Sequence, residues 1–155
     1  VGDGPFPTEL HDAVGEQLRA RGHEFGTTTG RPRRCGWFDA VVLRYTVAIN
    51  GFTALNLTKL DILSGQPLLK IAVAYELDGR RLELFPASMA ALERIKVVYE
   101  ELPGWSEQLT DCKSFEDLPA NAQHYVTRIE QLCGAPIVWI GVGAGREHMI
   151  VRPRP

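Results

Sequence analysis

The sequence predicts a single α/β unit in which a mixed sheet is flanked by helices. Segments with apolar residues at helical spacing, such as 8–21 and 120–132, alternate along the chain with β-rich segments such as 68–77. Asp78-Gly79 follows one of the β-rich segments and is a strong signal for a two-residue hairpin turn. Hydrophobic residues make up 45% of the 155 residues, which is enough for a folded core and argues against a disordered chain.

Two helices are predicted near the start of the chain, one on each side of a loop. Apolar residues recur every four positions from Leu10, so a helix is predicted over 8–21, with Thr8 as its N-cap and Gly22 at its end. A second helix is predicted over 39–49, because apolar residues again line one side of the segment and an Asn-Gly pair follows it.

The rest of the chain is predicted to consist of short strands and two further helices. Strands are expected where β-branched, aromatic and leucine residues gather between turn signals. The predicted strands cover 54–60, 68–77, 80–85, 95–102, 136–142 and 148–152, and the predicted helices cover 88–94 and 120–132. Gly134 is expected to cap the last helix, and 106–117 is expected to be an irregular surface segment.

Composition excludes several classes of protein. The net charge is −2, so no overall positive field attracts the chain to nucleic acid. Cys35, Cys112 and Cys133 are scattered and lack metal-ligand spacing, so free thiols in a reducing, cytoplasmic compartment are expected. No apolar run is long enough to cross a membrane and no signal peptide is recognisable. The four histidines are dispersed, so structural or surface roles are expected for them.

Residues 26–37 form the stretch around which the other elements are organised. It places three threonines, Thr27, Thr28 and Thr29, before Gly30, and then three arginines, Arg31, Arg33 and Arg34, around Pro32. The proline fixes one φ angle and removes a backbone donor, so a helix is disfavoured. Guanidinium groups bind carboxylate and phosphate in bidentate fashion, so the stretch suits an anion. The alternatives are a solvated basic loop and a surface that binds nucleic acid.

Another candidate site is Lys59-Leu60-Asp61, at the end of a predicted strand. An aspartate carboxylate can accept hydrogen bonds from both N1–H and the 2-amino group of guanine, whereas adenine offers neither donor. A lysine stem nearby can lie over the base. The alternative is an ordinary solvated pair of charges. Likewise, Gly141-Val142-Gly143 is either a backbone approach to a ligand or an ordinary exit from a strand.

Residues 26–37 resemble the substrate loop of the adenylosuccinate synthetase family. Four other stretches agree with that family in the same order: 1–10, 57–63, 102–105, and 139–143 before Arg146. The resemblance covers the whole chain, 1–155, which then corresponds to roughly the C-terminal third of the enzyme. It implies an α/β fold that forms the C-terminal part of a larger P-loop-like, GTP-dependent ligase. The start of the chain, which lacks an initiator methionine, also reads as the middle of a longer protein.

The resemblance implies a reaction in which IMP, L-aspartate and GTP give adenylosuccinate, GDP and phosphate, the first committed step from IMP to AMP. Magnesium is the implied cofactor, and the implied enzyme is a cytoplasmic homodimer without nucleic-acid or membrane partners. The chain has no Gly-x-x-x-x-Gly-Lys loop. The phosphate loop, the catalytic residues and most of the magnesium ligands are therefore expected in an absent N-terminal region. No catalytic or metal residue is expected here, and the chain alone is expected to be inactive.

The resemblance also implies roles for individual residues. Thr27, Thr28, Thr29, Gly30, Arg31, Pro32 and Arg33 would bind the L-aspartate substrate, and Lys59, Leu60, Asp61, Gly141, Val142 and Gly143 would bind guanine. Arg31 would also contact IMP, Arg33 would approach the GTP phosphates, and Val1 would lie near the IMP ribose. Pro32 departs from the arginine or lysine common in the family. Gly141 replaces a serine of many bacterial members, so its contact would be through the backbone.

An alternative of a different class is a non-catalytic nucleotide- or RNA-binding module that uses the basic residues 31–34. The combination of Lys59 and Asp61 distinguishes the two possibilities, because a protein that binds an RNA backbone does not need a carboxylate aimed at guanine. Such a protein would also show more basic surface than this chain offers.

Overall fold

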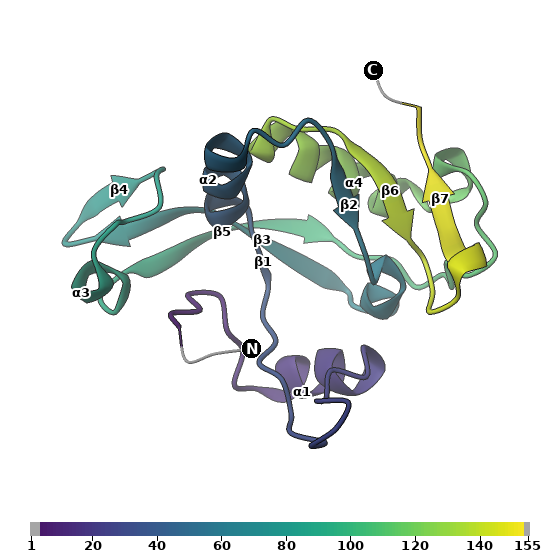
Figure 1. Cartoon of the computed structure of the whole chain (residues 1–155), viewed down its shortest axis with the longest axis horizontal. Helices are drawn as coiled ribbons and strands as arrows, with labels where there is room; N and C mark the ends of the chain where they lie inside the picture. The colour runs from purple at the N-terminus through teal and green to yellow at the C-terminus, as the bar shows by residue number, and fades with distance from the viewer. Residues whose placement is uncertain (1–3, 154–155) are drawn as a thin grey trace. The chain divides into compact units, whose positions relative to one another are not determined.

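The computed structural model describes residues 4–153 (Figure 1). These residues form two compact units, each built from two separate stretches of chain. Unit 1 contains the described residues up to Val41 together with 70–100, and unit 2 contains 42–69 and the described residues from Glu101 onwards. No helix within 4–153 has both the length and the apolar character needed to cross a membrane.

The helices are α1 (Ala13–Arg21), α2 (Ala40–Asn50), α3 (Met89–Leu92) and α4 (Ala120–Cys133), with 3-10 turns η1 (Leu60–Leu63), η2 (Phe115–Asp117) and η3 (Arg146–His148). The strands are β1 (Phe38–Asp39), β2 (Leu55–Leu57), β3 (Leu68–Leu77), β4 (Arg80–Leu82), β5 (Lys96–Pro103), β6 (Ile137–Gly141) and β7 (Met149–Val151). The strands form two sheets instead of the one predicted: a four-stranded sheet of β1, β3, β4 and β5, and a three-stranded sheet in the order β2-β6-β7.

The four-stranded sheet is organised around β3 (Figure 1). β3 pairs in parallel with β1 and antiparallel with β4, and β5 also pairs with β3. Ile71 and Tyr75 of β3 are fully buried. The Tyr75 hydroxyl donates to Asp39 Oδ2 over 2.6 Å, and Asp39 Oδ1 accepts from the Val41 amide over 3.0 Å, so Asp39 also caps the start of α2. Burial, together with this hydrogen bond, raises the pKa of Tyr75.

The three-stranded sheet is covered by α4 (Figure 1). The buried residues of α4 recur at helical spacing: Ala122, Tyr125, Val126, Ile129 and Cys133. Glu130 of α4 fastens the helix to the sheet, because its Oε1 accepts from the Ile137 amide and from the Arg152 guanidinium, each over 2.7 Å. The guanidinium of Arg152 also lies 4.1 Å from the centre of the Phe115 ring.

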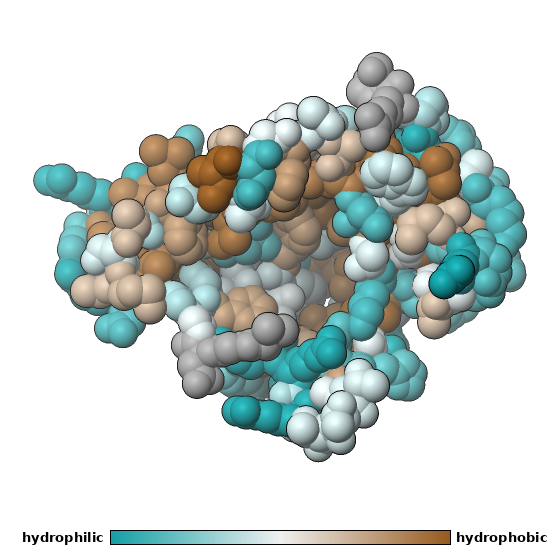
Figure 2. Space-filling model, viewed as in Figure 1, coloured by the Kyte–Doolittle hydropathy of each residue, from teal (hydrophilic) through white to brown (hydrophobic). Residues whose placement is uncertain are grey.

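Part of the surface of unit 2 is apolar. Figure 2 shows apolar residues at the surface over α2, where Ile49 and Phe52 are exposed. Trp139 and Val151, which face each other across β6 and β7, are also exposed. Clusters of this kind are typical of surfaces that contact other protein segments or partners.

The α/β class and several elements are confirmed. β3 matches the predicted strand over 68–77, and α4 matches the predicted helix to within a residue. Asp78 and Gly79 both have positive φ, as the hairpin turn requires, and Gly134 caps α4 with φ 73°. Cys112 and Cys133 are buried and Cys35 is half-buried, and all three are free thiols.

The predicted start of the first helix is wrong. The helix begins at Ala13, and its N-cap is Asp12, whose carboxylate accepts from the amides of Val14 and Gly15. Thr8 is fully buried, and its hydroxyl donates to the Trp37 carbonyl over 2.7 Å. Thr8 thus serves a long-range contact with a segment 29 residues away, and the helical periodicity around it gave no sign of that partner.

We predict that Asp12→Ala lowers the free energy of unfolding by about 1 kcal/mol, because two amides at the start of α1 lose their acceptor. Asp12→Asn should retain most of the stability, since asparagine is an equally good N-cap. Denaturant titration followed by circular dichroism measures both. An unchanged midpoint in Asp12→Ala would mean that the Asp12 cap does not stabilise α1.

Candidate functional site

The first candidate site lies at the carboxyl ends of β2 and β6. These strands are neighbours and parallel, with Leu57 paired to Ile140, so both ends open at the same edge of the sheet. A Cβ on Gly141 would lie 3.3 Å from the Cα of Thr58 and 3.5 Å from the Lys59 amide nitrogen. The structure thus brings the segments 58–61 and 141–143 together, as a shared site requires. Ligands of open α/β sheets bind at such carboxyl ends.

The chain changes direction sharply at Lys59, between β2 and η1. Lys59 has φ 61°, in the left-handed region that non-glycine residues rarely adopt. Leu60 then begins η1 with only 1% of its surface exposed. Leu60 is therefore the anchor of the turn, and it can contact a ligand only through its backbone. The side chain of Lys59 lies at the surface.

Asp61 is the most informative residue of this site. Its Oδ1 atom is buried, yet it accepts no hydrogen bond from any residue within 4–153. An unsatisfied buried acceptor costs roughly 1–3 kcal/mol, and more when it is charged, so native structures contain few of them. A carboxylate held in this way is suited to accept hydrogen bonds from donors of a ligand.

The loop after β6 is closed by His148. The Val142 amide donates to the His148 carbonyl over 2.8 Å, and the Gly145 amide donates to His148 Nδ1 over 3.2 Å. A Cβ on Gly143 would clash with the imidazole of His148, so a larger residue there requires the His148 side chain to move. Gly141 and Val142 are buried, whereas Gly143 is half-buried. Of the segment 141–143, Gly143 therefore offers the most accessible backbone.

The second candidate site, in unit 1, is the loop 26–31. The Gly26 amide donates to the Arg31 carbonyl and the Gly30 amide donates to the Gly26 carbonyl, each over 2.8 Å. Gly30 has φ 64°, so the turn requires a residue without a Cβ or a strained one. The Thr29 hydroxyl accepts from the Arg31 amide over 3.3 Å. Thr27 and Thr28 are exposed at the tip of this closed loop.

The three arginines near this loop differ in their partners. Arg31 is exposed, and its guanidinium makes no hydrogen bond or ion pair that the structure records among the described residues. Arg33 is paired with Glu24 over 3.1 Å and is also exposed. Arg34 is bound to Glu9 over 2.6 Å and donates to the Gly4 carbonyl over 2.7 Å. Arg31 is thus the arginine most available to a ligand.

Arg34 has a structural role that the sequence did not reveal. Besides its bonds to Glu9 and Gly4, its guanidinium lies 5.3 Å from the centre of the Phe6 ring. The Leu10 amide donates to the Cys35 carbonyl over 2.9 Å, and the Trp37 amide to the Thr8 carbonyl over 3.2 Å. These contacts fasten the segment before α1 to residues 34–37, which end the stretch 26–37 (the arginine loop). The hydrogen bond from Arg34 lowers the pKa of Glu9.

Two contacts implied by the resemblance, Val1 with the IMP ribose and magnesium with its ligands, are not supported by residues 4–153. Val1, expected near the IMP ribose, lies outside the described residues. Within 4–153, no group of three or more His, Cys, Asp or Glu side chains is arranged to hold a metal ion. This part of the chain therefore does not fit a magnesium site by itself, and we assign no metal-dependent step to its residues.

Comparisons with known proteins agree with one another. Residues 1–150 match the family model described as adenylosuccinate synthetase. The chain is 56% identical over 155 residues to the adenylosuccinate synthetase of Pelobacter propionicus and 54% identical to that of Myxococcus xanthus. The structure matches the fully ligated adenylosuccinate synthetase from Plasmodium falciparum with a TM-score of 0.94 and 46% sequence identity, over 99% of this chain and 37% of that one. The chain spans 36% of the length of the two bacterial relatives.

The pKa shift of Glu9 leads to a pH-dependent prediction. Its folded-state pKa lies below the ordinary 4.5, so the bond to Arg34 stabilises the fold above that pH and is lost as the pH falls through the folded-state pKa. Glu9→Gln should therefore lower the thermal midpoint at neutral pH, and its difference from the unmodified chain should shrink in acid. Glu93→Gln, at an exposed glutamate of unit 1, is the control. A difference that stays constant with pH would mean that Glu9 acts through packing.

Proposed function

The chain belongs to the adenylosuccinate synthetase family, and we propose that it forms part of a GTP-dependent ligase that joins L-aspartate to IMP. The products are adenylosuccinate, GDP and phosphate. The orphan Oδ1 atom of Asp61, beside the backbone of 141–143, is the observation that carries this proposal at the level of residues. The substrates, the magnesium cofactor, the homodimeric state and the cytoplasmic location are proposed from the family.

The site at β2 and β6 is proposed to bind the guanine base of GTP. The carboxylate of Asp61 accepts from N1–H and from the 2-amino group, and both donors are absent from adenine. Lys59, whose side chain is at the surface, supplies an aliphatic stem that lies over the base. Gly143 contributes backbone, while Leu60, Gly141 and Val142 are buried and hold the shape of the site.

The loop 26–31 is proposed to bind L-aspartate. The Arg31 guanidinium is exposed and can hold a substrate carboxylate in a bidentate manner, with the Thr27 and Thr28 hydroxyls nearby at the loop tip. Arg31 also contacts IMP in this proposal. Thr29, Gly30 and Pro32 then serve chiefly to shape the loop, since the Thr29 hydroxyl already accepts from the Arg31 amide.

Arg33 is proposed to approach the phosphates of GTP. In the structure its guanidinium is paired with Glu24 over 3.1 Å, and the arginine side chain is 47% exposed. Exposed ion pairs contribute only about 0–1 kcal/mol, so exchanging Glu24 for a phosphate group is inexpensive. Glu24 then holds Arg33 in place until the nucleotide binds.

The proposed reaction has two steps. A base proposed to lie outside this chain takes the N1 proton of IMP, and the bond between the γ-phosphorus and the bridging oxygen of GTP breaks as a bond to O6 of IMP forms, which releases GDP. The amine of L-aspartate then attacks C6, the C6–N bond forms, and phosphate leaves with O6. Magnesium, when bound, neutralises phosphate charge, and its ligands are proposed to lie outside this chain. The residues described here bind and orient the base and the amino acid, which lowers the entropic part of the barrier.

We predict that Asp61→Asn in the complete enzyme lowers kcat/KM for GTP roughly ten- to a hundredfold, because a charged hydrogen bond is lost and the amide NH₂ faces guanine donors. Asp111→Asn, at an exposed aspartate of unit 2, is a matched control and should leave kcat/KM near that of the unmodified enzyme. Steady-state kinetics with varied GTP test this. An unchanged value in Asp61→Asn would remove Asp61 from the base site.

We also predict that Arg31→Leu raises the KM for L-aspartate far more than the KM for GTP, because the carboxylate loses its bidentate partner. Arg31→Lys should restore only part of the affinity, since an ammonium lacks the planar pair of donors. Arg80→Leu, at an exposed arginine of β4, controls for the loss of one positive charge. Equal increases in both KM values would indicate a general electrostatic role for Arg31.

A further inference from the structure

The segment 102–105, Leu-Pro-Gly-Trp, has no role in the proposed function, although its tryptophan is buried in unit 2. Trp105 is 5% exposed, and its indole Nε1–H donates to the Oγ atom of Ser64 over 3.1 Å. Ser64 is itself buried and directly follows η1, the turn that contains Asp61. Trp105 is therefore hydrogen-bonded to a residue that lies only three positions after Asp61 in the chain.

The backbone around Ser64 is fastened at several points. The Ser64 amide donates to the Asp61 carbonyl over 3.2 Å, and the Gly65 amide donates to the Trp105 carbonyl over 2.7 Å. The Gly104 amide donates to the Pro67 carbonyl over 3.1 Å. A Cβ on Gly104 would overlap the Gln66 carbonyl, so the two segments cross as closely as their backbones permit. The end of η1 is thus held against the segment 104–105.

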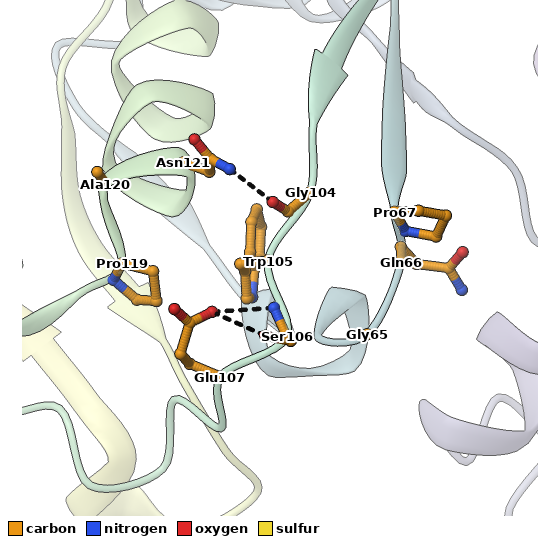
Figure 3. A pocket seen from close by; sticks show the side chains of 10 residues that line it. All are labelled: Gly65, Gln66, Pro67, Gly104, Trp105, Ser106, Glu107, Pro119, Ala120 and Asn121. Atoms are coloured by element: carbon orange, nitrogen blue, oxygen red, sulfur yellow. Dashed lines mark hydrogen bonds between the residues drawn. The ribbon is translucent and has the colours of Figure 1, made fainter.

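Trp105 is in turn fixed by α4. Its ring packs against Tyr125 with a centroid distance of 6.0 Å and a tilt of 60°. Asn121 donates from Nδ2 to the Gly104 carbonyl over 2.7 Å, and Figure 3 shows Trp105 between Asn121 and the turn at Gly65. Trp105 also borders an open cavity of about 540 Å³, so packing does not enclose the residue on every side. The packing on Tyr125 and the hydrogen bond to Ser64 together orient the indole.

On the basis of the function proposed above, we propose that Trp105 and Ser64 are positioning residues that set the carboxylate of Asp61 for guanine. Turning towards water or another donor would stabilise a carboxylate that has a buried, unsatisfied oxygen. Leu60 anchors one end of η1 by burial, and the Trp105–Ser64 bond holds the other end. The orientation of Asp61 before the nucleotide binds depends on both anchors.

The test uses the complete enzyme with Ser64→Ala and Trp105→Phe, which remove the acceptor and the donor in turn. kcat/KM is measured with GTP and with ITP, which lacks the 2-amino group. If Asp61 is mispositioned, each variant should lose about three- to tenfold in kcat/KM for GTP and less for ITP, so that the GTP/ITP ratio falls towards that of Asp61→Asn. The KM for L-aspartate should not change. The double variant should lose no more than the worse single variant, because both act through one bond.

Ser88→Ala, at an exposed serine whose side chain makes no capping hydrogen bond, is the matched control. Thermal midpoints are recorded for every variant. A lower midpoint with an unchanged GTP/ITP ratio would overturn the proposal and leave Trp105 with a purely structural role. Should Trp105→Phe fail to fold, the ratio in Ser64→Ala decides. An unmodified enzyme that uses GTP and ITP equally would instead refute the reading of guanine by Asp61, and the positioning role with it.

Discussion

The parallel pairing of β2 with β6 is the constraint on which the candidate nucleotide site depends. The register that sets Leu57 beside Ile140 brings two segments more than 80 residues apart in the sequence to one edge of the sheet. The two segments lie so close that a Cβ on Gly141 would be 3.3 Å from the Cα of Thr58 and 3.5 Å from the Lys59 amide nitrogen. The carboxylate of Asp61 lies in the turn that follows directly. The candidate site is therefore a consequence of the parallel order and register of β2 and β6.

The arginine loop illustrates how position divides one residue type between two roles. Arg31, Arg33 and Arg34 lie within four positions of each other and look alike in the sequence. Arg34 contacts Glu9, Gly4 and Phe6, so its guanidinium stabilises the loop and is not available to a ligand. Arg31, at the end of a closed turn, has no such neighbour among the described residues. This division weakens the alternative of an RNA-binding surface, which needs several arginines presented together.

Among the described residues, Asp61 and Arg31 are proposed to bind the base and the amino acid, and Arg33 is the group proposed to approach the phosphates. No cluster of potential metal ligands is present within 4–153, and the sequence has no Gly-x-x-x-x-Gly-Lys loop. The curated relatives are longer, and the chain spans 36% of their length. We therefore propose that this chain binds the base and the amino acid, and that most of the groups acting on the phosphates lie outside it.

The sequence was sufficient to predict the α/β class, the strand 68–77 and the helix over 120–132, because each depends on local periodicity and turn residues. It also supplied the candidate site residues, through short motifs and the family resemblance, and their binding roles stay predictions. It did not determine that the strands form two sheets, that Thr8 binds Trp37, that Asp12 caps α1 or that Arg34 is structural. Three of these four depend on partners far away in the chain. The fourth, the cap at Asp12, is linked to one of them, because Thr8 bonds to Trp37 and does not cap the helix. Periodicity reports the environment of a residue along its own element, and only the tertiary structure decides which distant atom it meets.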